Sequence, residues 1–330
     1  MKIGIAGVHY GHIGGMFRSA INAPNGDVIG IYEPRDELYH KYADDHDLQR
    51  FDDLESLVIA SDMVAEGMRH EEKADLVKLC ARHGTYAYLD KPLCRNDDDY
   101  DRIASAVSES GIKLTMNFTS RRYPPFVALQ QAIHNDELGE IVSLITTHPH
   151  KLGSSAPDWY FDSTRYAGVF HDLAGHGVDQ ILWLTGTTAT VVHAMGTAKR
   201  WTTEPVLEVD HIQASIQLSS GALATATADW LTPQNSPSFG DTRFILMGTK
   251  GSAHLHAYAE NGLLICSEKK GRYSPDLPKT SNEGFVEDAI SAFERGEENF
   301  VSTADILSVA RTCLAAERSA RNGGELIRLP

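Results

Sequence analysis

The chain opens with MKIGIAGVHYGHIGGMF at residues 1–17, where a short apolar run leads into a glycine-rich segment. The run predicts a strand over residues 2–7, and the next segment predicts a helix over residues 12–24 that ends at a proline. A strand, a glycine-rich turn and a helix in this order are typical of a dinucleotide-binding unit, because glycine lets the backbone approach the pyrophosphate.

The glycine spacing of this turn departs from the usual G-x-G-x-x-G. Read from Gly7, the pattern puts His9 and His12 at the second and third glycine positions. On its own, this spacing fits a plain strand, turn and helix as well as a nucleotide cradle. Glu33, however, ends the next predicted strand 22 residues after Gly11, close to the usual spacing of about 20 for a carboxylate that binds the ribose hydroxyls.

The first third of the chain alternates strand-like and helix-like segments. Further strands are predicted at residues 27–33, 61–68 and 85–92, and further helices at residues 35–47 and 71–84. Strands separated by helices imply right-handed crossovers and therefore a parallel sheet that is covered on both faces.

The pattern changes after about residue 139. Strand-like runs joined by turn residues then follow one another, at residues 139–150, 188–199, 210–220, 221–231, 241–249 and 251–258. They predict a large, mostly antiparallel sheet. Two prolines in FTSRRYPPF interrupt any helix at the change, so we expect domains at 1–120 and 121–330 in an α/β protein.

Composition excludes several classes of partner. The chain has 330 residues, of which 42% are hydrophobic, and a formal net charge of −15. This negative charge disfavours nucleic acid and anionic membrane surfaces as partners. The sequence shows neither a long apolar segment nor a secretory leader, and its four cysteines lack metal-ligand spacing, so we expect a cytoplasmic protein with reduced thiols.

The segment YAYLDKPLC at residues 86–94 places an acidic residue, Lys91 and Pro92 after a predicted strand. This arrangement resembles the E-K-P motif of the Gfo/Idh/MocA oxidoreductases (glucose-fructose oxidoreductase and inositol dehydrogenase-like), with Asp90 in place of the glutamate. Four later segments resemble further features of that family, in matching order. Residues 117–125 resemble its arginine-proline junction, and residues 166–186 resemble its glycine-rich turn with the D-x-x-x-H-x-x-D helix. Residues 245–255 resemble its G-T-x-G-S strand pair, and residues 315–330 resemble its closing segment.

The resemblance implies an N-terminal Rossmann domain, a C-terminal α+β domain built on a large open sheet, and a nicotinamide cofactor. The chain departs from the family where a T-P-N-like turn is replaced by Met68-Arg69-His70. We expect the cofactor to contact residues around the strand ends, namely Gly7, His9, Tyr10, Gly11, His12, Glu33, Arg35, Met68, His70, Asp90 and Lys91.

Residues Asp172, His176 and Asp179 are spaced to share one face of a predicted helix. Histidine suits the removal of a hydroxyl proton, so His176 is the predicted general base, and Asp172 would orient its ring or contact a second hydroxyl. Lys91 would donate to the same reacting oxygen from the other domain. A solvated helix face is the alternative interpretation, and Asp179 could pair with a nearby arginine.

The irregular segment at residues 148–166 is the predicted substrate loop, although its aromatic residues could instead form a small core of their own. The substrate contacts predicted from the loop and from the junction are Trp159, Arg165, Tyr166 and Arg122, beside Lys91, Asp172 and His176. A metal could be held by His148 and His150 together with Asp172 and its flanking His171 and His176. His148 and His150 bracket a proline, however, so we predict no metal site.

The predicted activity is an NAD-dependent oxidation of a secondary hydroxyl in a sugar, polyol or cyclitol. Glu33 favours NAD over NADP because it would repel a 2′-phosphate, although Arg35 could receive one. A sheet with one uncovered face predicts a homodimer or homotetramer. Two alternatives remain: a redox-neutral glycosidase or epimerase that keeps its NAD, and a non-catalytic nucleotide-binding sensor.

Overall fold

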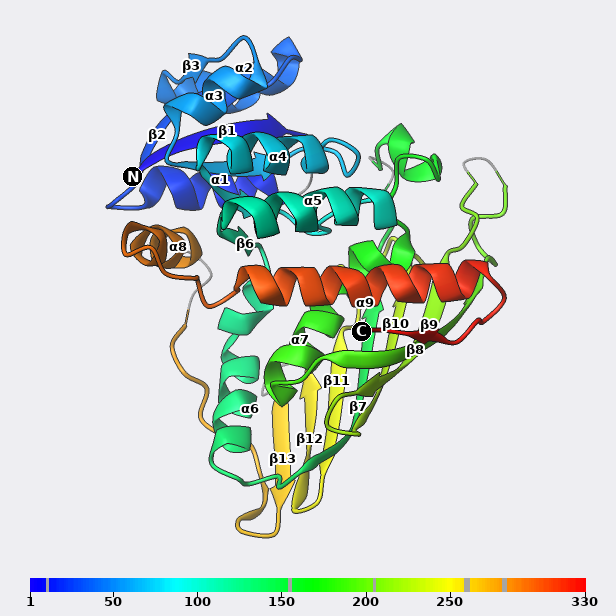
Figure 1. Cartoon of the computed structure of the whole chain (residues 1–330). Helices are drawn as coiled ribbons and strands as arrows, with labels where there is room; N and C mark the ends of the chain where they lie inside the picture. The colour runs from blue at the N-terminus through cyan, green and yellow to red at the C-terminus, as the bar shows by residue number, and fades with distance from the viewer. Residues whose placement is uncertain (10–11, 154–155, 204–205, 258–261, 281–283) are drawn as a thin grey trace. The chain divides into compact units, whose positions relative to one another are not determined.

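The computed structural model describes residues 1–9, 12–153, 156–203, 206–257, 262–280 and 284–330 (Figure 1). The chain folds into two compact units. The first unit comprises residues 1–118 and 282–307, and the second comprises residues 119–281 and 308–330. Among the described residues, no helix has the length and apolar composition needed to cross a membrane.

The first unit contains a six-stranded parallel sheet in the order β3-β2-β1-β4-β5-β6, which confirms the predicted Rossmann arrangement. Its strands are β1 (Lys2–Val8), β2 (Asp27–Tyr32), β3 (Gln49–Arg50), β4 (Met63–Gly67), β5 (Tyr86–Leu89) and β6 (Leu114–Met116). Its helices are α1 (Ile13–Asn22), α2 (Asp36–Ala43), α3 (Leu54–Ala60), α4 (Lys73–His83), α5 (Asp97–Ser110) and α8 (Phe285–Glu294). Strands β1 and β4 are buried almost throughout, as expected for a sheet covered on both faces.

Two helices of this unit, α3 and α5, are absent from the sequence predictions. Each begins after a short polar side chain that accepts a hydrogen bond from the backbone N–H three residues later. Asp53 accepts from Ser56 at 2.8 Å, and Asn96 accepts from Asp99 at 3.0 Å. These N-caps are readable signals for a helix start, which hydrophobic periodicity alone does not reveal.

The segment at residues 282–307 lies in the first unit, so the prediction that places it in the domain beginning at residue 121 is wrong. Its helix α8 packs through aromatic rings. Phe285 stacks on Tyr88 with ring centroids 5.2 Å apart, and Phe293 stacks on Tyr86 at 4.5 Å. These contacts join residues about 200 positions apart, which is why local patterns give no sign of them.

The second unit contains a nine-stranded sheet in the order β14-β13-β12-β11-β7-β10-β9-β8-β15. All its strand pairs are antiparallel except β7 with β10, which confirms the prediction of a mostly antiparallel sheet. The strands are β7 (Ile141–Pro149), β8 (Ala189–Thr197), β9 (His211–Leu218), β10 (Leu223–Asp229), β11 (Arg243–Gly248), β12 (Gly251–His256), β13 (Leu263–Ser267), β14 (Gly271–Tyr273) and β15 (Ile327–Arg328).

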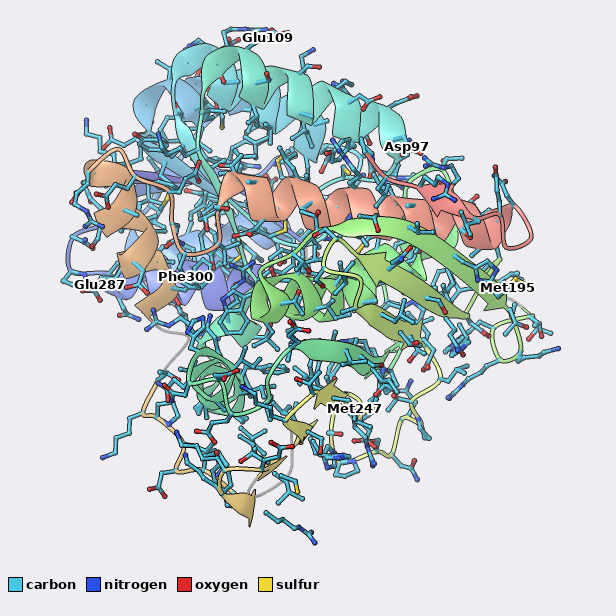
Figure 2. The ribbon with its side chains drawn as sticks, turned by 60° about the horizontal axis from the view of Figure 1, so that its bottom comes forward. Asp97, Glu109, Met195, Met247, Glu287 and Phe300 are labelled. Carbon is cyan, nitrogen blue, oxygen red and sulfur yellow. The ribbon has the colours of Figure 1, made fainter. Side chains whose placement is uncertain are left out.

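Helices α6 (Pro124–His134) and α7 (Gly175–Thr185) lie against one face of this sheet (Figure 1). The long helix α9 (Thr303–Arg321) begins in the first unit and continues in the second. Along β9, buried residues alternate with exposed Gln213, Ser215 and Gln217, so the opposite face carries the outward side chains. Met195 on β8 and Met247 on β11 are among the exposed apolar residues of the sheet (Figure 2).

Gly248, in the segment that resembles a G-T-x-G-S strand pair, lies where the register of β11 against β7 shifts. A Cβ atom at this position would lie 2.1 Å from the Leu138 carbonyl oxygen. The same oxygen accepts a hydrogen bond from the Lys250 N–H at 2.9 Å. Glycine is therefore required here by close backbone approach.

We expect Gly248→Ala to lower the free energy of unfolding of the second unit by about 2 kcal/mol, because backbone cannot yield as a flexible side chain can. Urea unfolding followed by tryptophan fluorescence measures this, since all four tryptophans lie in the second unit. Gly175→Ala in α7 is the control, because no atom lies within 4 Å of a Cβ placed there. Equal stability of the two variants would contradict the packing argument.

Candidate active site

The β1–α1 turn of the first unit places Gly7 at a positive φ of 67°. A Cβ atom on Gly7 would lie 2.8 Å from the Met68 side chain, so only glycine fits at this turn. Helix α1 begins at Ile13 with His12 as its N-cap, and Gly14 lies in its first turn. The fingerprint read from Gly7 puts His12 at the third glycine position and passes over Gly14. Tyr10 and Gly11, two of the predicted cofactor contacts, lie outside the described residues.

Glu33 follows β2 and is 1% exposed. Its carboxylate accepts hydrogen bonds from the Val8 N–H at 3.0 Å and from the Arg35 side chain at 2.7 and 3.0 Å. Burial pushes the pKa of Glu33 upward, but hydrogen bonds from His9, Arg35 and Val8 hold it far below its usual range. Glu33 is therefore a fixed anion, and the Arg35 guanidinium is already bound to it.

His9 lies between two carboxylates. Its Nδ1 is 3.5 Å from Glu33, and its Nε2 is 3.3 Å from Glu72 at the start of α4. Burial lowers the pKa of His9, but the two carboxylates outweigh burial and raise it. A pocket opens beside this residue at the carboxyl ends of β1, β2 and β4, where ligands bind in open parallel sheets. Residues of the first unit line it, including Gly7, His9, Arg35, Met68, Arg69 and Glu72.

Asp90, Lys91 and Pro92 follow β5. The Asp90 side chain is fully buried, accepts from the Lys91 N–H at 2.8 Å and lies 3.0 Å from the His12 ring. Burial raises the pKa of Asp90, but His12, Lys73 and Lys91 outweigh it and lower this pKa to about 2. Asp90 thus joins the β1–α1 turn, through His12, to the predicted catalytic Lys91. His70, another predicted cofactor contact, is fully buried after β4.

In the second unit, Asp172 lies in a π-helical turn (Phe170–Ala174) that runs directly into α7, which carries His176. The prediction of one regular helix across this segment is therefore wrong. Asp172 and Asp179 are fully buried, which overturns a solvated face as the interpretation of their spacing, while His176 is half-buried. π-turns are rare, and no periodic pattern in the sequence distinguishes them.

The Asp172 carboxylate accepts a hydrogen bond from the Tyr166 hydroxyl at 2.9 Å, and that hydroxyl accepts from Trp230 Nε1 at 3.2 Å. Burial, together with Asp172, raises the pKa of Tyr166 well above its usual value, so Tyr166 remains a neutral donor. Tyr160 stacks on Tyr166 with ring centroids 5.0 Å apart, and Trp159 packs edge-on against Tyr160. The loop aromatics thus pack together and orient Asp172. Arg122 and Arg165 are half-buried.

Asp179 pairs with an arginine, which was one of the two interpretations of its spacing. Arg121 Nη2 lies 2.6 Å from the Asp179 carboxylate, and both side chains are almost completely buried. The pair ties α7 to the junction segment at residues 119–122. Removing either partner would break this buried ion pair, at a cost of about 3–5 kcal/mol.

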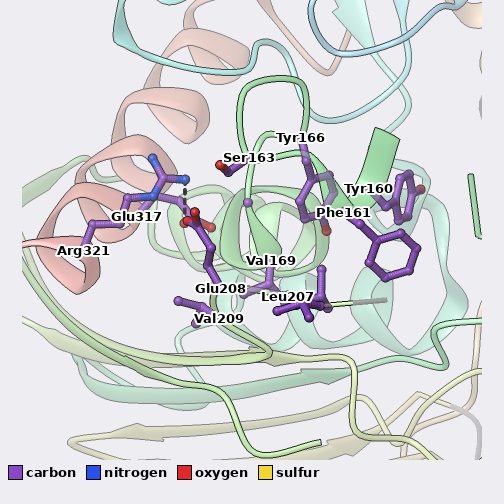
Figure 3. A pocket seen from close by; sticks show the side chains of 12 residues that line it. Tyr160, Phe161, Ser163, Tyr166, Val169, Leu207, Glu208, Val209, Glu317 and Arg321 are labelled. Carbon is purple, nitrogen blue, oxygen red and sulfur yellow. Dashed lines mark hydrogen bonds and ion pairs between the residues drawn. The ribbon is translucent and has the colours of Figure 1, made fainter. Parts of the chain in front are cut away.

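Glu317 on α9 belongs to the same site, and it lies in the segment at residues 315–330 that resembles the family's closing segment, where the resemblance singles out no individual residue. Its buried carboxylate accepts from the backbone N–H groups of Phe170 at 2.7 Å and His171 at 3.3 Å, and it lies 3.4 Å from Arg321 (Figure 3). Gly168, with φ of 97°, leaves room for it, since a Cβ there would lie 2.3 Å from the carboxylate. Glu317 therefore anchors the start of the turn that carries Asp172.

Two family models match this chain. The oxidoreductase family model described as an NAD-binding Rossmann fold matches residues 1–118, and the GFO/IDH/MocA C-terminal domain model matches residues 126–254. The chain belongs to the GFO/IDH/MocA oxidoreductase family. The resemblance seen in the sequence motifs is thereby confirmed.

Relatives of this oxidoreductase are distant. Residues of the chain are 28% identical over 273 positions to inositol 2-dehydrogenase of Rhizobium meliloti, covering 74% of each chain. They are 26% identical over 215 positions to the uncharacterized oxidoreductase YrbE of Bacillus subtilis, covering 64% of this chain and 58% of that protein. The solved structure of a levoglucosan dehydrogenase in complex with NADH superposes with a TM-score of 0.87 at 20% identity, covering 100% of this chain and 99% of that one.

One of the histidines considered as a metal ligand, His148, has other contacts in this oxidoreductase. His148 on β7 packs against α7, where a Cβ on Gly177 would lie 2.2 Å from its Nε2. Its Nε2 lies 2.9 Å from the Thr146 hydroxyl. Within the described parts of the chain, no group of three or more His, Cys, Asp or Glu side chains is arranged to hold a metal ion.

Proposed function

We propose that this chain is an NAD-dependent dehydrogenase that oxidises a secondary hydroxyl of a sugar, polyol or cyclitol in the cytoplasm. The observation that carries the proposal is the turn Asp90–Pro92, whose buried anion fixes the position of Lys91 at the carboxyl end of β5. Family membership and the named substrates of its relatives, inositol and levoglucosan, support this substrate class. The four cysteines are not joined by disulfides, which agrees with a reducing compartment.

In the proposed alcohol oxidation, each of these residues would have a separate role. His176 would take the proton of the reacting hydroxyl, and Asp172, held by Tyr166, would orient the histidine or bind a second hydroxyl. The Lys91 ammonium would donate to the same oxygen and favour its ionised form. The bound nicotinamide would accept the hydride that leaves the carbon. We propose Trp159, Arg165 and Arg122 as further substrate contacts.

The residues around the first-unit pocket fit a dinucleotide without a 2′-phosphate. Glu33 is a fixed anion, and the Arg35 guanidinium that could receive a phosphate is bound to that carboxylate. Glu71, Glu72 and Asp75 add three carboxylates to the wall of the same pocket. We therefore propose NAD rather than NADP as the cofactor. The main-chain turn at Gly7 and the first turn of α1 would approach the pyrophosphate.

The purified protein should bind NADH at least about tenfold more tightly than NADPH, since one close like charge near a protein surface costs more than the roughly 1.4 kcal/mol to which a factor of ten corresponds. Fluorescence titration with both cofactors measures the two dissociation constants. Glu33→Gln should bring the dissociation constants of NADH and NADPH closer together, because it removes the negative charge that would repel the 2′-phosphate. Tighter binding of NADPH by the unaltered protein would overturn the assignment.

Replacing Lys91 by Met or His176 by Ala should lower turnover by a factor of about 100 or more while leaving NADH affinity within threefold. A panel of sugars and inositols, followed by absorbance at 340 nm, supplies the substrate and the rate. Lys78→Met is the matched control, because Lys78 is exposed on α4. Normal turnover in the Lys91 or His176 variant would refute the assigned roles.

Product formed without accumulation of NADH would instead indicate a redox-neutral reaction, in which the hydride returns to the substrate. Absence of both NADH and altered product across the panel would favour a nucleotide-binding sensor. The three outcomes are mutually exclusive, so one assay separates the proposed dehydrogenase from both alternatives.

The outward face of the nine-stranded sheet supports a homodimer or homotetramer. Ile145 and Ile245 are direct partners across β7 and β11, and Leu223 and Met247 both pair with Ser143. Ile145, Leu223 and Met247 are among the exposed apolar residues, so these side chains form a patch that a second copy would cover. The patch lies on the sheet face opposite α7.

Light scattering should give a mass of at least twice the 36.2 kDa of one chain at micromolar concentration. Ile145→Lys should shift the particle toward the mass of one chain by placing a charge in the patch. Ile59→Lys is the control, since Ile59 is exposed on α3 of the first unit and should leave the mass unchanged. A one-chain mass for the unaltered protein would contradict the proposal.

A further inference from the structure

We propose that Lys73 and Glu66, a buried ion pair in the first unit, are positioning residues that hold the backbone on both sides of Lys91. We call the contacts of this pair with the backbone beside Lys91 the clamp. The effect of the clamp on catalysis rests on the proposed function of Lys91, whereas the contacts themselves do not. Lys73 lies in α4, and Glu66 lies in β4. Both side chains are 0% exposed, and Lys73 Nζ is 2.9 Å from Glu66 Oε1.

The ammonium group of Lys73 directs its hydrogen bonds to the catalytic turn. Besides Glu66, it donates to the carbonyl oxygen of Asp90 at 2.6 Å and to that of Pro92 at 3.0 Å. These two carbonyl groups flank Lys91 along the chain. A lysine ammonium has three N–H donors, so it can donate to Glu66 and to both carbonyl groups at once.

Glu66 holds the same turn from the other side of the ion pair. Its Oε1 accepts from the Asp90 N–H at 2.8 Å, and its Oε2 accepts from the Met68 N–H at 2.8 Å. The pair therefore binds the N–H of Asp90, the carbonyl of Asp90 and the carbonyl of Pro92. Through the Met68 N–H, the pair also holds the turn after β4. The Met68 side chain packs against Gly7.

Stability alone does not explain a buried pair at this place. The neighbouring residues of β4, Met63, Val64 and Ala65, are apolar and fully buried. Replacing a buried ion pair by packed apolar residues is often neutral or stabilising, so a charged pair inside an apolar strand points to a different role. The hydrogen bonds of this pair reach the backbone beside Lys91 and the turn after β4.

The Lys73 charge also acts on two buried carboxylates, Glu66 and Asp90. Burial raises the pKa of Glu66, the Lys73 charge opposes this rise, and Asp90 adds to it. Lys73 likewise contributes to keeping Asp90 ionised. Without Lys73, Glu66 and Asp90 would repel each other across the turn, and Asp90 would hold the Lys91 N–H and His12 less firmly.

Small shifts of a catalytic group have large effects, since a misplacement of about 1 Å can cost a factor of about 100 in rate. The clamp would hold the Lys91 ammonium where it meets the reacting hydroxyl. Losing the clamp should therefore lower kcat more than it changes KM, because Lys91 would be displaced while the rest of the substrate contacts stay in place.

The experiment compares Lys73→Met and Glu66→Gln with the control Lys78→Met, which makes the same change on an exposed position of α4. Hydrogen exchange of the amides at residues 89–94 reports on the clamp directly. Turnover at 340 nm, measured with the substrate found in the panel, reports on its consequence. Glu66→Gln is close in shape to the native side chain and keeps the test valid if Lys73→Met does not fold.

Lys73→Met should speed exchange at residues 89–94 at least tenfold and lower kcat at least tenfold, with KM changed less than threefold. Glu66→Gln should change both in the same direction by a smaller factor, and Lys78→Met should change neither. Unaltered exchange in both variants would overturn the clamp. Faster exchange with unaltered kcat would overturn its catalytic role. If the unaltered protein oxidises no compound in the panel, the proposed function fails, while the exchange rates still decide the clamp.

Discussion

A buried carboxylate needs donors and positive charge around it, and Asp90 receives them from three segments at once. His12 comes from the start of α1, Lys73 from α4, and Lys91 follows Asp90 in the chain. The need to compensate this one anion therefore brings together the cofactor turn and the predicted catalytic lysine. Their relative placement within the first unit follows from electrostatics and hydrogen bonding as much as from the packing of apolar strands.

Buried carboxylates with their own hydrogen-bond donors also hold the segment of the second unit that carries His176. Asp172, Asp179 and Glu317 are all buried, and each carboxylate has its own donor: the Tyr166 hydroxyl, the Arg121 guanidinium and two backbone N–H groups. These contacts hold the π-turn and the helix that follows it. Such an arrangement lowers stability somewhat, because each anion must be desolvated, and it holds the segment proposed for catalysis rigidly.

The features that could be predicted from the sequence are those with a local signal. Alternating strands and helices, the spacing from Gly11 to Glu33, and the motif around Lys91 lie within short windows, and the family models confirm the resemblance they indicate. The roles of Glu317 and Lys73 could not be predicted, because each acts on backbone groups that only the tertiary fold brings near. The π-turn before α7 also gives no periodic signal, whereas the caps of α3 and α5 are readable in the sequence.

In the proposed reaction, hydrogen leaves a carbon of a polyhydroxylated substrate as hydride and arrives on NAD. The most direct measurement uses inositols and sugars deuterated at carbon, with the mass of the NADH formed determined by mass spectrometry. We predict NADH that is heavier by one mass unit, in an amount equal to the ketone produced. Unlabelled NADH, or product formed with the deuterium still on the substrate and no NADH released, would contradict this claim.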